Sequence, residues 1–91
     1  MADGRPYRLE LSDLVVKQLR KLPQDLCRRI RQRLGQLAAD PRGTQPQARA
    51  LKGQRGVFRL RIGEWRALYE LDHRRRLVRV LEIGPGHDVY D

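Results

Sequence analysis

The stretch VFRLRIGEWR, Val57–Arg66, decides the fold because the periodicity of the chain changes there. Apolar and charged side chains alternate from Phe58 to Ile62, which is the pattern of a half-buried strand. Gly63-Glu64 supplies a two-residue turn, and the alternation resumes from Trp65 to Asp72. We therefore predict a β-hairpin with strands over residues 57–62 and 65–72.

A two-residue turn fixes the register of such a hairpin. Arg61 is expected to face Arg66, and Arg59 to face Leu68. Because cross-strand partners point to the same side of a sheet, the three arginines share one side. The other side is predicted to be a continuous apolar surface, made of Phe58, Leu60, Ile62, Trp65, Ala67, Tyr69 and Leu71.

Upstream, the sequence predicts one strand and two helices. The segment Pro6–Leu11 alternates polar and apolar residues, as a short half-buried strand does. Ser12 is a favoured N-cap for a first helix, which Pro23 ends while suiting the first turn of a second. Apolar residues recur at helical spacing in both, and Asp40-Pro41 begins a turn. Since almost no linker separates the helices, we expect an antiparallel helical hairpin.

The remaining segments complete the predicted topology. Gly43–Gly56 is polar and rich in Gly, Gln and Pro, which predicts a connecting loop, and Arg76–Ile83 predicts a last strand of an antiparallel meander. The expected order is β-α-α-β-β-β. This is an α+β fold in which the two-helix hairpin packs on one face of an antiparallel sheet. With 91 residues, we expect a single domain, 1–91.

The charge balance points to an anionic partner. The chain has 20 Lys+Arg against 11 Asp+Glu, a net charge of +9, and nucleic acid rewards such a surface through counterion release. An acidic protein partner is compatible with the same charge. Cys27 is the single cysteine, and no membrane-span-length apolar run occurs, so we expect a cytoplasmic protein. The spacing of His and Cys predicts no metal site, and no cofactor is expected.

The three hairpin arginines raise a question of function. Like charges directly opposite each other on a sheet are destabilising, so the pair Arg61 and Arg66 carries a cost. One interpretation is a solvated face whose long side chains splay apart. The other is anion binding, because guanidinium groups are permanently charged and offer bidentate donors that fit a phosphate. The repulsive pair favours anion binding.

The central segment resembles the RelE/ParE family of toxins from type II toxin–antitoxin systems. The matching residues are Leu51-Lys52-Gly53 and the run Gly56–Glu70, with the motif G-V-F-R-L-R-I-G-E-W-R at its start. The Leu22-Pro23 junction and the terminal pattern of Ile83, Gly84, Asp88, Val89 and Tyr90 are also similar. The resemblance covers nearly the whole chain and implies a toxin.

This resemblance implies candidate site residues. Arg59 and Arg61 match basic positions of RelE-like members, Arg66 matches the arginine that binds the scissile phosphate, and Tyr90 matches the terminal tyrosine. Lys52 either contacts phosphate or flanks a turn at Gly53. Glu70 is a conceivable base if it borders the arginines. Four helical arginines either contact ribosomal RNA or are solvated, namely Arg28, Arg29, Arg31 and Arg33. The family commonly has an arginine shortly before the tyrosine, whereas this chain reads Gly84-Pro85-Gly86-His87-Asp88.

Charge stabilisation and proton transfer are expected to depend on different residues. Arginines stabilise phosphorane charge but are effectively never deprotonated, so they do not act as the base. We hypothesise that His87 is the acid or base, since its ordinary pKa lies near neutrality. Tyr90 would stack on a base or shape the approach of the 2′-hydroxyl. A loop histidine without a role is the alternative for His87.

Three functions follow from the family. The first is a metal-independent endoribonuclease that cleaves mRNA in the ribosomal A site and inhibits translation. The second is a non-nuclease inhibitor of DNA gyrase, as in ParE-like members, and the third is an inactive basic binding module. The resemblance also implies an acidic, RelB-like cognate antitoxin in a hetero-oligomeric complex, with a monomeric free toxin.

Overall fold

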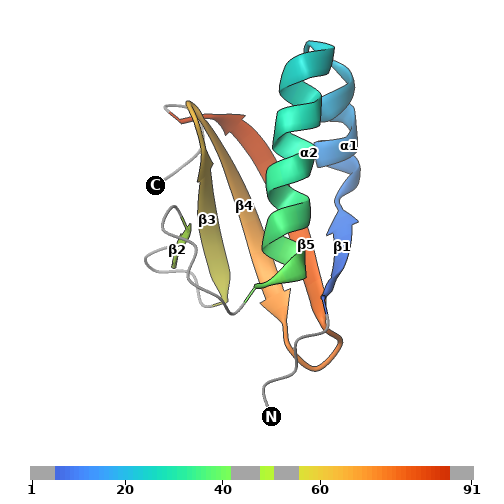
Figure 1. Ribbon diagram of the computed structural model, residues 1–91, viewed down its shortest axis with the longest axis vertical. Coiled ribbons are helices and arrows are strands. Elements are labelled where there is room, and N and C mark those ends of the chain that lie inside the picture. The colour runs from blue at the N-terminus through green and yellow to red at the C-terminus, as the bar shows by residue number, and fades with distance from the viewer. Residues whose placement is uncertain (1–5, 42–47, 51–55, 87–91) are drawn as a thin grey trace.

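The computed structural model describes residues 6–41, 48–50 and 56–86. Its elements follow in the order β1 (Arg8–Leu11), α1 (Asp13–Arg20), α2 (Gln24–Ala39), β2 (Ala48–Ala50), β3 (Val57–Ile62), β4 (Trp65–Asp72) and β5 (Leu77–Pro85). The predicted α+β order is confirmed, with one additional short strand, β2. Two antiparallel helices lie beside a curved sheet (Figure 1).

The sheet is mixed rather than antiparallel. Its strand order is β1-β5-β4-β3-β2, and β1 pairs with β5 in parallel, with Arg8 opposite Leu77. The expectation of an all-antiparallel sheet is therefore wrong for β1. Parallel strands require a crossover connection, and the helices together with the β2–β4 segment provide it.

The β3–β4 hairpin has the predicted bounds and register. Ile62 pairs with Trp65, Arg61 with Arg66, and Phe58 with Tyr69. Gly63 has a φ of +61°, a left-handed conformation that glycine adopts without steric cost. The two-residue turn thus aligns the strands as the sequence predicts.

The predicted loop over Gly43–Gly56 contains a strand. Residues Ala48–Ala50 pair antiparallel with β3, and Arg49 is in register with Arg59. This strand was missed because three residues are too few for an alternation pattern, and alanine has little preference for strands. Pairing with the open edge of β3 supplies hydrogen bonds that local sequence does not reveal.

The first helix covers an edge of the sheet. The Ser12 hydroxyl accepts a hydrogen bond from Val15 N at 3.1 Å, which confirms it as the N-cap, and donates to Leu81 O at 2.9 Å. The Ile83 N–H donates to Gln18 Oε1 at 3.0 Å. Side chains of α1 therefore satisfy backbone groups of β5 beyond the end of β1. Pro23 is the N-cap of α2 and not its first helical residue.

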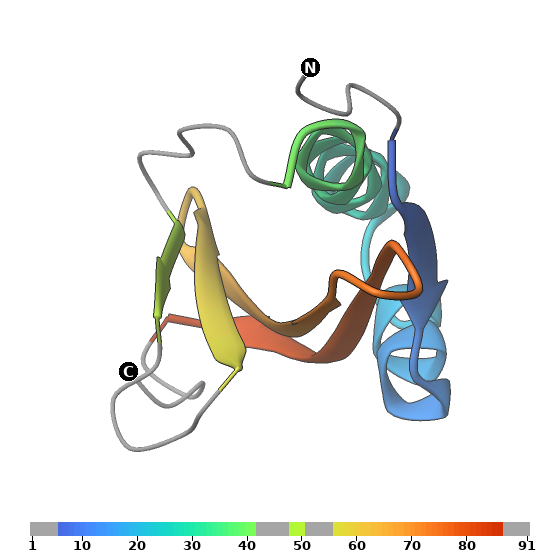
Figure 2. The same cartoon turned by 90° about the horizontal axis from the view of Figure 1, so that it is seen from below.

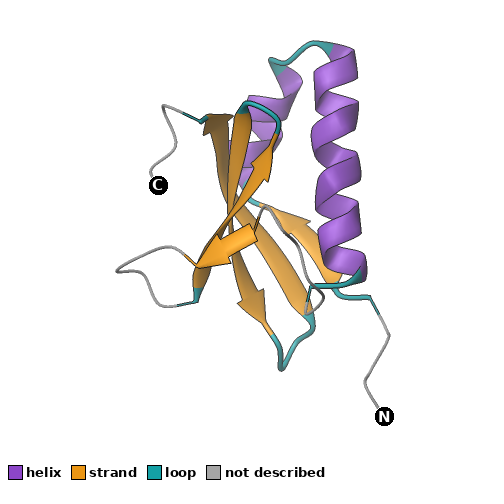
Figure 3. Cartoon of the chain, turned by 60° about the vertical axis from the view of Figure 1, so that its left-hand side comes forward, coloured by secondary structure: helices purple, strands orange, loops and turns teal. Residues whose placement is uncertain are grey.

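Helix α2 lies over the concave face of the sheet in Figure 2, and both helices lie on one side of the sheet in Figure 3. The core lies between α2 and this face. Ile30, Leu34 and Leu37 of α2 are fully buried, and Val15 and Leu19 of α1 join the same cluster. The predicted apolar side of the hairpin contributes both buried and partly buried members, namely Phe58, Leu60, Ile62, Trp65, Ala67, Tyr69 and Leu71. Both helices of the described ranges fall short of the length and apolar character needed to cross a membrane.

Candidate nucleic-acid interface

Three arginines occupy the face of the β3–β4 hairpin that points away from the core, and we call this group the arginine face. Arg59 and Arg61 alternate along β3, and Arg66 lies opposite Arg61 on β4. Arg61 is exposed, whereas Arg59 and Arg66 are half-buried. The predicted convergence of the three residues on one side of the hairpin is therefore present.

The guanidinium of Arg66 lies against the end of β5. A Cβ built on Gly86 would stand 3.0 Å from Arg66 Nη1 and 3.1 Å from its Cζ. The backbone there is held by a hydrogen bond of 2.7 Å from Gly86 N to Glu64 O. The absence of a side chain at position 86 thus lets the guanidinium approach the main chain closely.

Two pockets meet at the β3–β4 turn. The first, the strand pocket, has a volume of about 450 Å³ and is lined by Arg61, Gly63, Glu64, Trp65, Arg66, Pro85 and Gly86. The second, the helix pocket, has a volume of about 410 Å³ and is lined by Arg29, Arg33, Arg61, Ile62, Gly63 and Glu64. Arg61 lines both pockets, and Glu64 is the acidic residue that they share.

Glu70 lies opposite Val57, on the side of the hairpin that carries the arginines, and it forms an ion pair with Arg79 of β5. Its carboxylate lies 3.9 Å from Arg79 Nη1, and Arg79 Nε also contacts Glu10 Oε1 at 2.9 Å. This ion-pair network crosses β1, β5 and β4. Glu70 is therefore an ion-pair partner of Arg79, and its use as a base stays a prediction.

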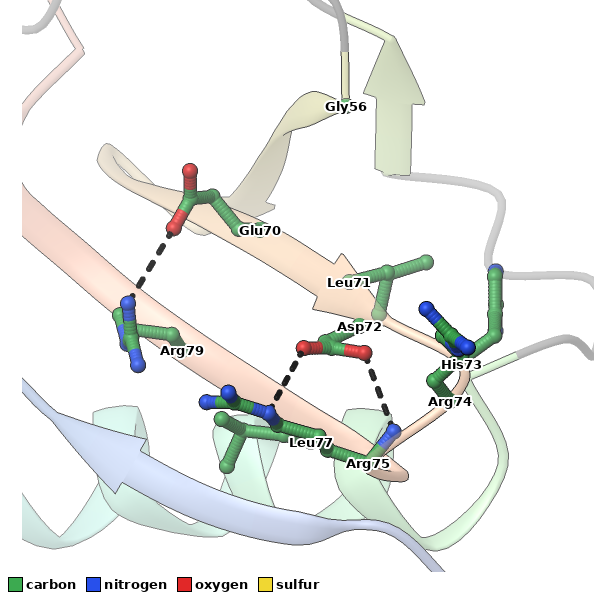
Figure 4. A pocket seen from close by; sticks show the side chains of 9 residues that line it. All are labelled: Gly56, Glu70, Leu71, Asp72, His73, Arg74, Arg75, Leu77 and Arg79. Atoms are coloured by element: carbon green, nitrogen blue, oxygen red, sulfur yellow. Dashed lines mark hydrogen bonds and ion pairs between the residues drawn. The ribbon is translucent and has the colours of Figure 1, made fainter.

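A third pocket lies at the β4–β5 turn, at the other end of the sheet (Figures 1 and 4). Its charges are largely matched within the protein. Asp72 Oδ1 accepts from Arg75 N at 3.0 Å, and Asp72 Oδ2 lies 3.7 Å from Arg75 Nε. His73 Nδ1 lies 2.7 Å from the Tyr7 hydroxyl. This pocket is lined by two carboxylates and three arginines, whereas the two pockets at the other end together are lined by four arginines and one carboxylate.

Proton transfer requires groups other than the arginines. Tyr69 is buried in the core, and burial raises its pKa to about 12, so it stays protonated near neutrality. In the part of the chain that the structure describes, no group of three or more His, Cys, Asp or Glu residues is placed to hold a metal ion. The arrangement on these residues supports charge stabilisation and anion binding.

Sequence comparison gives the family. The profile of the family described as "ParE toxin of type II toxin-antitoxin system, parDE" matches residues 9–90. The chain belongs to this family. It is a RelE/ParE-type toxin of a type II toxin–antitoxin system, as its sequence predicts. A search of the curated proteins finds no match.

Solved structures of RelE toxins share the fold of this ParE-family toxin. The archaeal RelE–RelB complex from Pyrococcus horikoshii has a TM-score of 0.77 at 24% identity, covering 92% of this chain and 99% of that one. The RelBE2 complex from Mycobacterium tuberculosis has a TM-score of 0.75 at 24% identity, covering 88% and 98%. The isolated Escherichia coli RelE toxin has a TM-score of 0.73 at 20% identity, covering 87% and 83%.

The structure brings together some of the predicted site residues of this ParE-family toxin. Arg61 and Arg66 share the strand pocket, and Arg59 lies on the same face of the hairpin. Lys52, His87 and Tyr90 lie outside the described residues. Their predicted roles stay predictions.

Two features of the interface were not predicted as parts of one site. Arg29 and Arg33 were interpreted only as helical arginines that contact RNA or are solvated, yet both line a pocket with Arg61. Their spacing of four residues places them on one helix face, which was the signal available in the sequence. The close approach of Gly86 to Arg66 could not be predicted from the sequence pattern.

Proposed function

We propose that this toxin is a ribosome-dependent endoribonuclease that cleaves mRNA in the A site without a metal ion. The observation that supports this proposal best is the arginine face, with Arg61 and Arg66 paired across the hairpin. Three permanent cations on a rigid two-stranded element suit a phosphate whose charge grows in the transition state. The site lies on strands and not on a loop, which favours precise positioning.

In the proposed mechanism the arginines hold the scissile phosphate. Arg66 would bind a non-bridging oxygen from the strand pocket, and Arg59 and Arg61 would neutralise the developing phosphorane charge. The attacking group is the 2′-hydroxyl of the preceding ribose. The P–O bond to the 5′-oxygen breaks, leaving a 2′,3′-cyclic phosphate and a 5′-hydroxyl.

We propose that a residue near the C-terminus transfers protons in this reaction. His87 would take the 2′-hydroxyl proton or protonate the 5′-oxygen, because imidazole exchanges protons near neutral pH, and water would take the other of these two roles. Tyr90 would orient a base by stacking. Lys52 would contribute a further phosphate contact.

The proposed partners are the ribosome, mRNA and an acidic cognate antitoxin in the cytoplasm. Several structural neighbours are complexes of a RelE toxin with a RelB antitoxin. An acidic antitoxin segment over the arginine face would relieve the repulsion within it and block RNA. We propose the same arrangement for this toxin, in a hetero-oligomeric complex.

Inhibition of DNA gyrase is the second candidate function. The observation that favours it is the match to the ParE profile over residues 9–90. ParE-like members act on gyrase and lack nuclease residues, and position 86 of this chain is glycine where the resemblance leads us to expect an arginine. Under this alternative, the arginine face binds a protein or DNA and no RNA is cleaved.

One experiment separates the two candidates. The purified toxin is added to a defined mRNA in a reconstituted translation system and, separately, to the same mRNA without ribosomes, and the cut sites are mapped by primer extension. We expect cuts in phase with codons, only when ribosomes are present. If the toxin makes no cuts and inhibits DNA supercoiling by purified gyrase, its function is gyrase inhibition and not mRNA cleavage.

The Arg66→Ala variant tests the proposed phosphate contact. We expect cleavage to fall by about a hundredfold or more, the usual effect of removing a group that stabilises transition-state charge. Arg66→Lys should restore only part of the activity because an ammonium lacks the bidentate geometry of guanidinium. Arg75→Ala removes the same charge at the far end of the sheet and serves as the control. Equal activities of Arg66→Ala and Arg75→Ala would refute the assignment.

A further inference from the structure

The arginine face does not end at the sheet. Arg61 lines the strand pocket and also the helix pocket, and the two pockets share Gly63 and Glu64 as well, so they are neighbours. The second pocket adds Arg29 and Arg33 from α2. Cations from β3, β4 and α2 thus form a continuous series around the β3–β4 turn.

The composition of this series suits a polyanion. Four arginines line the two pockets (Arg29, Arg33, Arg61 and Arg66), against one carboxylate, Glu64. By contrast, the pocket at the β4–β5 turn includes Glu70 and Asp72, both in ion pairs with arginines (Figure 4). The arginines exceed the carboxylates by three in the two pockets at the β3–β4 end, and by one at the β4–β5 turn, where Arg74, Arg75 and Arg79 line the pocket.

The geometry of α2 separates these arginines from others on the same helix. Arg29 and Arg33 are four residues apart and face the β3–β4 turn, with Arg33 Nη1 donating to Gln36 Oε1 at 2.9 Å. Arg28 and Arg31 line a different pocket, together with Leu19, Leu22, Gln24 and Cys27. Arg28 also lies 3.7 Å from Asp25. One helix thus carries two arginine pairs on different surfaces.

We propose that Arg29 and Arg33 extend the arginine face into a track for single-stranded RNA. Nucleotides flanking the phosphate held at Arg66 pass over the β3–β4 turn, and the backbone phosphates contact Arg61 and then α2. Single-stranded RNA is the occupant that this surface fits, because its phosphates repeat at short intervals and its chain bends around a turn. Trp65, which is half-buried, also lines the strand pocket on this route. This inference takes its ligand class from the proposed function.

RNA length is the variable that tests the track. The affinity of the free toxin is measured for fluorescent single-stranded RNAs, one a dinucleotide and one of about ten nucleotides, a common single-strand site size. The variant is R29Q/R33Q and the matched control is R28Q/R31Q, which removes the same charge from the same helix. Glutamine keeps much of the side-chain stem, and thermal unfolding verifies that both variants fold.

We expect R29Q/R33Q to weaken binding of the longer RNA by about tenfold at low salt and to leave the dinucleotide nearly unaffected. The slope of log affinity against log salt should become shallower by about 1.4, since each phosphate contact to a single strand contributes about 0.7. R28Q/R31Q should bind both RNAs almost as the wild type does.

Several results would overturn the track. Equal losses for both RNA lengths, or equal losses for the two double variants, would indicate a general charge effect. Unchanged RNA binding with weaker binding of a polyglutamate peptide would assign Arg29 and Arg33 to an acidic protein partner. Because the assay uses free toxin, it is independent of cleavage. If the toxin does not cleave mRNA on the ribosome but R29Q/R33Q shows the length-dependent loss, the track stands and the proposed function fails. If the toxin cleaves mRNA but R29Q/R33Q shows no length-dependent loss, the proposed function stands and the track fails.

Discussion

Arg61 faces Arg66 across the β3–β4 hairpin, and this pairing of like charges is a local conflict. Arg61 is exposed, and its Nε donates only a long hydrogen bond of 3.4 Å to Gly63 O. Opposed like charges on a sheet cost a few tenths to one kcal/mol. A binding site accepts such a cost when its ligand supplies the opposite charge.

Replacing Arg61 with glutamine is expected to stabilise the free toxin and weaken its function. The free energy of unfolding should rise by about 0.2–1 kcal/mol because the repulsion of Arg66 is removed. Cleavage and RNA affinity should fall because Arg61 lines both pockets. Chemical denaturation and the translation assay measure the two effects. Arg31→Gln, an equal charge change on the exposed surface of α2, controls for net charge. A loss of stability in Arg61→Gln, or a gain matched by Arg31→Gln, would contradict this account.

At the scale of elements, α1 has a role that its amphipathic pattern does not reveal. It supplies Val15 and Leu19 to the core, as expected, and it also closes the edge of β5. The Ser12 hydroxyl performs two tasks, since it caps α1 and binds Leu81 O. The start of the helix is thereby tied to the strand that carries Gly84 and leads to Gly86.

The Ser12→Ala substitution should therefore lower the free energy of unfolding by more than the removal of an exposed N-cap does. We expect a decrease of about 1–2 kcal/mol in the free energy of unfolding, because one N-cap bond and one partly buried acceptor are lost together. Urea denaturation followed by circular dichroism measures the difference. Ser12→Thr retains a hydroxyl and should stay close to wild type. If threonine and alanine destabilise equally, the hydroxyl does not make the contribution assigned to it.

The same scale shows why only part of the fold could be predicted. The β3–β4 register follows from a two-residue turn and a strict alternation, both local features of residues 57–72. The direction of β1 depends on β5, which is 69 residues away at the pair Arg8 and Leu77, so local pattern cannot determine it. The strand β2 forms because β3 has an open edge, and its own three residues predict nothing.

The candidate site divides in the same way. The convergence of Arg59, Arg61 and Arg66 could be predicted because it needs only the hairpin register. The contact between Arg66 and Gly86 depends on where β5 ends relative to β4, and a register shift between Leu68 and Tyr69 alters that alignment. Arg29 and Arg33 join the site through the packing of α2 over the sheet, a tertiary relationship that helical spacing alone does not specify.

At the scale of the whole molecule, charge and stability respond to pH through different residues. Of the 20 basic residues, only Lys17, Lys21 and Lys52 are lysines, so most of the positive charge is carried by guanidinium groups, which keep their charge in proteins. The electrostatic surface should therefore persist into the alkaline range. The stability of the fold should decrease in the alkaline range, because the core contains the ionisable residue Tyr69. Its ring stacks on Phe58 with the ring centroids 5.5 Å apart.

The core should begin to fail above pH 10 while the arginine surface keeps its charge. Burial raises the pKa of Tyr69 from 10.0 to about 12, so between these values the unfolded chain releases a proton that the folded chain retains. Stability from this group is complete below pH 10 and is lost progressively as the pH approaches 12, by about 2–3 kcal/mol. Denaturation midpoints of wild type and Tyr69→Phe, measured from pH 8 upward to about pH 11.5, isolate this contribution because other titrating groups are common to both. Phenylalanine should flatten the alkaline decline, and parallel declines in the two proteins would show that another group controls it.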